Sequence, residues 1–91
     1  MTAEEMAAVV ATEIAHGIRH LREHRQLTQQ GLAERMGVSQ SLIARWEDPA
    51  YRGWTVTTLI AIAVALQARL RVRYEELDAV RPLPAPPQET P

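Results

Sequence analysis

The chain has 91 residues, no cysteine and a formal net charge of −1. A chain of this length can bury a single core, and without cysteine it has neither a disulfide framework nor a cysteine-ligated zinc site. The near-neutral total does not exclude a nucleic-acid partner, because the charges are unevenly spread. Residues 19–52 carry six of the ten arginines and only four acidic residues, and a local basic face is what phosphate binding requires.

Residues 3–25 predict one long amphipathic helix or two helices in series. Their apolar side chains recur at helical spacing, at Met6, Val9, Val10, Ile14, Ile18 and Leu21. The acidic first turns lack the positive region of a signal peptide. The longest apolar run, residues 59–66, is too short to cross a bilayer. We therefore expect a cytoplasmic protein with no membrane partner.

Residues 27–47 predict two short helices joined by a tight turn. Thr28 and Ser39 are good N-caps, because a hydroxyl can accept a hydrogen bond from a backbone N–H at a helix start. Gly37 suits the left-handed conformation that ends the first helix. The apolar positions are Leu32, Ala33, Met36, Leu42, Ile43 and Trp46. Helices this short cannot bury themselves, which favours a helix-turn-helix whose second helix enters a DNA groove.

The rest of the chain predicts a loop, a helix, a strand and a tail. Asp48-Pro49 ends the second helix, and Thr55 caps a helix over residues 56–67 that is apolar on more than one side. Residues 69–74 alternate between arginine and apolar or aromatic side chains, which indicates a strand. The alternative is a fifth helix through residues 74–77. Residues 81–91 contain five prolines and predict a disordered or extended tail.

Taken in order, these residues resemble the XRE family, the DNA-binding domains similar to the Cro and cI repressors. The resemblance covers about residues 18–66 and is carried by Leu21-Arg22, Leu27-Thr28-Gln29, Leu32-Ala33, Gly37-Val38-Ser39-Gln40, Ile43, Trp46-Glu47, Thr58-Leu59, Ile62-Ala63 and Ala65-Leu66. It implies a mainly α fold, a lambda-repressor-like helix-turn-helix bundle of four to five helices. To this we add one short C-terminal β-strand that pairs across a dimer. The expected parts are an amphipathic helical extension (1–17), the DNA-binding domain (18–67), a dimerisation strand (68–77) and a disordered Pro-rich tail (81–91).

Individual residues can be assigned roles on this basis. In the resembled family an arginine at the place of Arg22 pairs with a glutamate at the end of the recognition helix, here Glu47. The alternative is a solvated Arg22 beside Glu23. The candidates for base contacts lie on the outer face of the second helix and are Gln40, Ser41, Ala44 and Arg45, since glutamine suits adenine and arginine suits guanine. The candidates for phosphate contacts are Thr28, Gln29, Ser39 and Arg52.

A lone strand has two open edges and needs a partner. The simplest partner is the same strand of a second copy, paired antiparallel across a two-fold axis. The expected dimer interface has Leu70, Val72 and Tyr74 facing the helices, with Ile60 and Val64 beneath them. Such a homodimer would hold two recognition helices about 34–36 Å apart and predicts a palindromic site.

Three histidines, His16, His20 and His24, lie one helical turn apart, and residues 20–24 match H-x-x-E-H, a pattern of some zinc proteases. The helix-turn-helix already explains Leu21 and Arg22, and the chain is too short to build a substrate cleft. We therefore expect no metal, no cofactor and no catalytic residue. A solvated or phosphate-facing histidine row is the interpretation that we favour.

Together these features predict a DNA-binding transcription regulator, a repressor that binds a palindromic operator in double-stranded DNA as a homodimer. The alternative is an antitoxin that binds a protein toxin through the N-terminal extension or the arginine-rich strand and regulates its own operon. The string Glu47-Asp48-Pro49-x-Tyr51 resembles a subgroup of the XRE family that includes antitoxin-like proteins. A metal-dependent enzyme is a third class, which the short chain disfavours.

Overall fold

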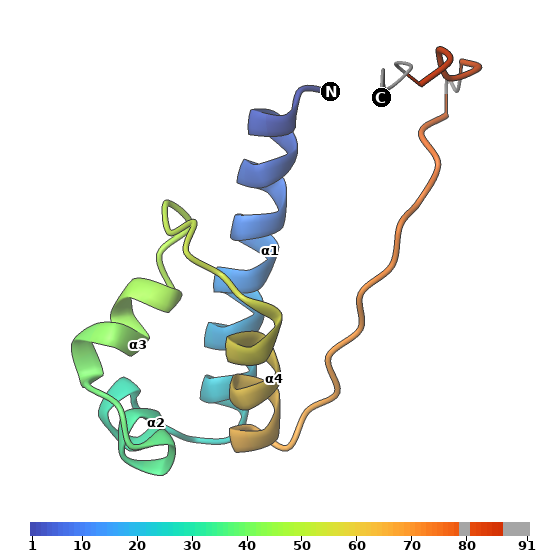
Figure 1. The fold of residues 1–91 in the computed structure, drawn as a ribbon. Helices are drawn as coiled ribbons and strands as arrows, with labels where there is room; N and C mark the ends of the chain where they lie inside the picture. Colours follow the sequence, from blue (N-terminus) through green and yellow to red (C-terminus); the bar gives the residue numbers. More distant parts are fainter. Residues whose placement is uncertain (79–80, 87–91) are drawn as a thin grey trace, which may run out of the picture.

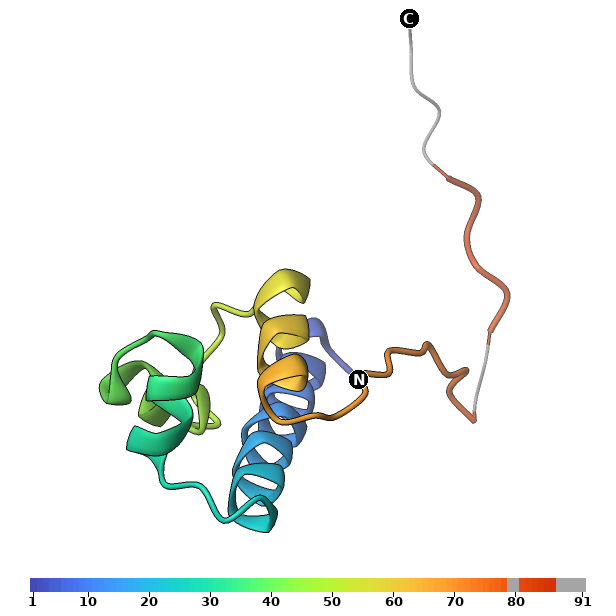
Figure 2. The ribbon, with the colours of Figure 1, turned by 90° about the horizontal axis from the view of Figure 1, so that it is seen from below.

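The computed structural model describes residues 1–78 and 81–86 (Figure 1). This part of the chain contains four helices, α1 (Ala3–His24), α2 (Gln29–Met36), α3 (Gln40–Trp46) and α4 (Val56–Ala65). Figures 1 and 2 show α2 and α3 together on one side of the molecule, with α4 lying against α1 on the other. The prediction of a mainly helical bundle is confirmed for this part of the chain.

Each helix begins after a hydroxyl side chain that accepts a hydrogen bond from the backbone N–H three residues later. These N-caps are Thr2, Thr28, Ser39 and Thr55, with N···O distances of 3.1, 2.9, 3.2 and 3.1 Å. The turn between α2 and α3 passes through Gly37, whose φ of 69° is left-handed. The short helices therefore start and stop where local chemistry directs them.

The core is one aliphatic cluster with a single tryptophan. Leu32, Ala33 and Ile43 are completely buried. The other buried members are Ile18, Trp46, Ile62 and Leu66, so all four helices and the residue that follows α4 contribute. Burial of these side chains supplies the packing that α2 and α3 need, because neither is long enough to be stable alone.

The first helix is continuous over 22 residues, which selects the single long helix over two helices in series. The boundary expected between residues 17 and 18 therefore lies inside a helix. Ala11 and Ala15 are buried, whereas Met6, Val9 and Val10 remain about half exposed at 47%, 49% and 46%. Among the described residues no helix combines the length and the apolar character needed to cross a bilayer.

The segment after α4, residues 69–78, is called the C-terminal arm below. It is exposed, and neither a strand nor a fifth helix forms along residues 69–78. A strand is defined by hydrogen bonds to a neighbouring strand, and a single chain offers the arm no neighbour. The C-terminal strand and its pairing across a dimer therefore stay predictions. Of the predicted tail, residues 81–86 are exposed without regular structure, and residues 87–91 lie outside the described part.

Candidate nucleic-acid interface

The third helix presents two different faces. Ile43 and Trp46 are buried in the core, whereas Gln40, Ser41 and Arg45 are exposed. Ala44, the fourth candidate for base contacts, is half-buried. A two-turn helix held by its apolar side, with its polar side turned outward, is the arrangement that a recognition helix requires.

Directly behind this helix, Glu47 forms a buried two-bond ion pair with Arg22 of α1. Arg22 Nε lies 2.6 Å from Glu47 Oε2, and Arg22 Nη2 lies 2.9 Å from Glu47 Oε1. The Glu47 side chain is 1% exposed and that of Arg22 is 10% exposed. Arg22 Nη1 also donates to the carbonyl oxygen of Leu27 at 2.8 Å. This arrangement links α1, the segment before α2 and the end of α3.

Opposing effects act on the ionisation of Glu47. Burial alone would raise the pKa of Glu47, because it removes water from the charged form. Hydrogen bonds from Arg22 and Gln29, together with the charges of Arg22 and Arg19, outweigh burial and hold the pKa of Glu47 below its ordinary value. The hydrogen bond to Glu47 in turn raises the pKa of Arg22. Both partners are therefore charged at neutral pH.

Acid should destabilise the fold through Glu47. Its pKa is lower in the folded chain than in the unfolded chain, so its contribution is complete above the ordinary glutamate pKa of about 4.3. The contribution is lost as the pH falls through the lower folded-state value. Urea unfolding at a series of pH values should show a flatter acid slope for Glu47→Gln than for the wild type. The control Glu34→Gln, at an exposed glutamate of α2, should keep the wild-type slope, and an unchanged slope in Glu47→Gln would contradict the assignment.

A short chain of hydrogen bonds leads from this ion pair to the outer face of α3. Gln29 Nε2 donates to Glu47 Oε1 at 3.3 Å, and Gln40 Nε2 donates to Gln29 Oε1 at 2.7 Å. A carboxylate can only accept hydrogen bonds, so Glu47 sets which end of the Gln29 amide faces it. Gln29 then sets the orientation of Gln40. The second amide hydrogen and the carbonyl oxygen of Gln40 are left to form the donor–acceptor pair that suits adenine.

The other candidates for phosphate contacts already bond within the domain. The hydroxyl oxygens of Thr28 and Ser39 accept their capping N–H groups, so only their hydroxyl hydrogens could serve a phosphate. Ser39 Oγ also lies 3.1 Å from Ser41 Oγ. Arg52 is exposed and folds back on its own loop, with Nη1 donating to the carbonyl oxygen of Pro49 at 2.6 Å.

The residues expected at the dimer interface are exposed but are not all brought together. Leu70 lines a cavity together with Leu59 and Ile62, whereas Ile60 and Val64 do not line it. Ile60 and Val64 lie on the outer side of α4, because its inner side is the one that packs on the core. Val72 and Tyr74 project into solvent. The expected placement of Leu70 over Ile60 and Val64 is therefore not the one that a single chain adopts.

The roles of three residues in this region were missed by sequence reasoning. Arg19 Nε lies 3.6 Å from Glu47 Oε1, and its spacing of one helical turn from Arg22 was the available signal. Trp54 packs on Trp46 with ring centroids 6.3 Å apart, and Tyr51 meets Trp54 edge-on at 5.0 Å. These aromatic contacts hold the loop after α3 against the domain.

The histidine row lies on the exposed side of α1. His16, His20 and His24 are all exposed, and the rings of His20 and His24 stack with centroids 6.3 Å apart. Within residues 1–78 and 81–86, no cluster of three or more histidine, aspartate or glutamate side chains could hold a metal ion.

The fold and this surface define a DNA-binding helix-turn-helix protein. Comparison with protein families agrees, since the helix-turn-helix family model matches residues 18–72, more than half of the chain. The chain belongs to the XRE family of helix-turn-helix proteins, whose members are transcription regulators and typically not enzymes. No curated protein is similar enough to the chain to count as a match.

Proposed function

We propose that this transcription regulator is a repressor that reads a palindromic operator as a homodimer. The observation that best supports specific reading is the hydrogen-bond chain from Glu47 through Gln29 to Gln40. It fixes the amide of the first residue of α3 before DNA arrives, which reduces the ordering that binding would otherwise require. Gln40 would read adenine through two hydrogen bonds.

The remaining outward residues of α3 complete the proposed reading surface. Arg45 lies one helical turn beyond Ser41 and would read guanine through two hydrogen bonds. Ala44 would pack against a thymine methyl group, and Ser41 can donate to or accept from either kind of base. Each of these contacts concerns one base pair, so together they would specify a short half-site.

The proposed phosphate contacts position the domain without reading sequence. Thr28 and Ser39 would donate their hydroxyl hydrogens, and Gln29 would donate the amide hydrogen that Glu47 does not accept. Arg52 would leave the carbonyl oxygen of Pro49 and turn to a phosphate, which supplies a full charge in place of a carbonyl dipole.

Selection of bound sequences from random duplex DNA, followed by footprinting, tests the proposal. We expect an inverted repeat whose half-sites are centred one helical turn of DNA apart, with adenine and guanine enriched at one position each per half-site. A single unrepeated half-site, or no enriched sequence, would exclude operator reading by a homodimer. Repression would be measured with a reporter gene whose promoter overlaps the selected site.

Replacing Gln40 or Arg45 by alanine should weaken operator binding by about 1–3 kcal/mol and relax the preference at one base pair each.

Arg52→Ala should weaken binding to every sequence and reduce the salt dependence by about one phosphate contact. Arg35→Ala is the matched control, because Arg35 is exposed at the end of α2 and lies near Arg25 and Ala65. If the Gln40 and Arg45 variants both keep full operator affinity and selectivity, α3 does not read the operator.

An antitoxin role is the alternative function. The exposed arginines of the arm, Arg69, Arg71 and Arg73, favour an acidic protein partner over an apolar one. Co-expression with the product of a neighbouring toxin gene would test it. A complex that forms with the wild-type chain but not with the variant in which the three arginines are changed to glutamine would support the antitoxin role.

A further inference from the structure

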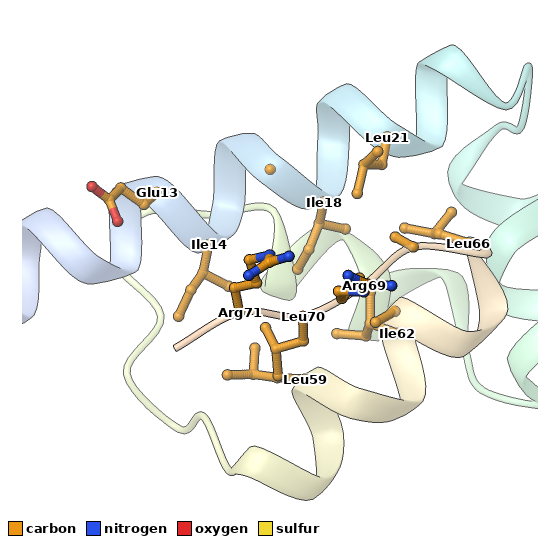
Figure 3. A pocket seen from close by; sticks show the side chains of 13 residues that line it. Glu13, Ile14, Ile18, Leu21, Leu59, Ile62, Leu66, Arg69, Leu70 and Arg71 are labelled. Carbon is orange, nitrogen blue, oxygen red and sulfur yellow. The ribbon is translucent and has the colours of Figure 1, made fainter. Parts of the chain in front are cut away.

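Where the C-terminal arm begins, it enters a groove between α1 and α4. A cavity of about 250 Å³ lies there, and its apolar lining includes Ile14 of α1, Leu59 of α4 and Leu70 of the arm (Figure 3). Glu13 and Arg71 line the same cavity. Leu70 therefore lies in this groove, where Figure 3 shows its side chain pointing toward Leu59 of α4, whereas the arm residues that follow are more exposed.

The apolar side of α1 continues beyond the point where the arm leaves it. Ile14, Val10 and Met6 follow one another at intervals of four residues, so they lie one above another on one face of the helix. We call these three residues the α1 stripe. Val10 and Met6 are apolar, yet about half of each residue is exposed to solvent. The stripe thus continues the apolar lining of the groove along α1, but its side chains at Val10 and Met6 are only partly covered.

The arm has an apolar face of matching period. Leu70, Val72 and Tyr74 lie on one face of an extended segment, because successive side chains alternate. Two residues of extended chain advance about 6.6 Å and four residues of helix about 6.0 Å. An arm that runs antiparallel to α1 therefore presents one apolar side chain at each step of the stripe. Figure 1 shows the arm running back toward the end of the molecule where α1 begins.

The charges of the two segments are complementary. The first fifteen residues carry Glu4, Glu5 and Glu13 and no basic side chain, whereas the arm carries Arg69, Arg71 and Arg73. When Leu70 and Val72 face the stripe, these arginines lie on the opposite face of the arm and can reach around the helix. A shift of one residue would place arginines on the stripe instead, so the alternation specifies the register.

We propose that residues 70–74 of the arm dock on the α1 stripe of the same chain, with Val72 on Val10 and Tyr74 on Met6. The N-terminal extension then provides the surface on which the arm docks. The proposed base-reading residues lie on α3, which Figure 2 shows on the opposite side of the molecule from the beginning of the arm. The outer edges of the docked arm remain open, which leaves them available for pairing with a second copy.

Limited trypsin digestion of the full-length protein tests the docking, because trypsin cleaves after Arg71 and Arg73. Val10→Asp should raise both cleavage rates at least threefold, since it places a carboxylate under Val72. Val9→Asp is the matched control: Val9 is equally exposed but projects from another side of α1, and its rates should equal those of the wild type. Circular dichroism checks that both variants stay folded. Equal cleavage rates in the two variants would overturn the proposal.

A second measurement identifies which chain supplies the arm. The natural chain has no cysteine, so Val10→Cys combined with Val72→Cys places two unambiguous thiols. A short bis-maleimide cross-linker should give a monomer-sized product on a denaturing gel. A product mainly of dimer size would overturn the assignment of the arm to its own chain. Unchanged affinity of Val10→Asp for an isolated half-site, which α2 and α3 of one chain would bind, would separate this inference from the proposed DNA reading.

Discussion

Replacement of Arg22 by methionine, or of Glu47 by leucine, should lower the free energy of unfolding by about 3–5 kcal/mol. Each change leaves a charge in a site that excludes water, since neither side chain is more than 10% exposed. The Arg22 change also removes the donor to the Leu27 carbonyl oxygen, and the Glu47 change removes the acceptor for Gln29. Urea unfolding at neutral pH, followed by circular dichroism, measures both losses.

The double variant should lose less than the sum of the two single losses, because no charge is then left without its partner. The control pair is Arg73 and Glu75, which are 3.5 Å apart but 81% and 71% exposed. The same cycle on that pair should give changes within about 0.5 kcal/mol, as is usual for surface ion pairs. Additive losses at Arg22 and Glu47 would show that their contact contributes nothing to stability.

Local signals in the sequence were enough to predict where α2, α3 and α4 begin, whereas α4 ends at Ala65 and not at the predicted residue 67. Thr28, Ser39 and Thr55 each accept a hydrogen bond from the backbone N–H three residues later, and Gly37 ends α2 through its own left-handed backbone conformation. Interactions of this range depend little on the rest of the fold, so a pattern of residue types is sufficient to find them. The pairing of Arg22 with Glu47 spans 25 residues, and it came from the family resemblance.

Contacts between helices could not be predicted in the same way. The bridge from Glu47 to Gln40 through Gln29 depends on how closely α2 and α3 pack and on side-chain torsion angles, which no spacing reveals. The arm is a second case. Its alternation predicted a strand, which the single chain does not form, and the position of Leu70 depends on the groove between α1 and α4. Ile60 and Val64 lie outside that groove, and their place in a dimer interface stays a prediction.

Changing Val72 to aspartate should convert the proposed homodimer to a monomer and weaken operator binding. Val72 is the central residue of the alternation from Leu70 to Tyr74, so antiparallel pairing across a two-fold axis would place the two copies of Val72 opposite each other. Side chains in such a pair are about 5 Å apart, and like charges there are destabilising. Burial beside the apolar stripe adds the desolvation of two carboxylates. Because a dimer binds two half-sites at once, losing it should reduce operator affinity by about 10²–10⁴-fold while leaving half-site affinity unchanged.

Analytical ultracentrifugation and operator titration, carried out on the same samples, measure the two losses together. Leu83→Asp is the control, because it introduces the same charge at an exposed apolar residue beyond the arm. It should leave both the sedimentation coefficient and the affinity unchanged. If Val72→Asp remained a dimer with full operator affinity, the arms would not form the interface. A wild-type chain that stays monomeric at high concentration and binds an isolated half-site as tightly as the full operator would exclude the homodimer itself, because the second half-site then contributes nothing to binding.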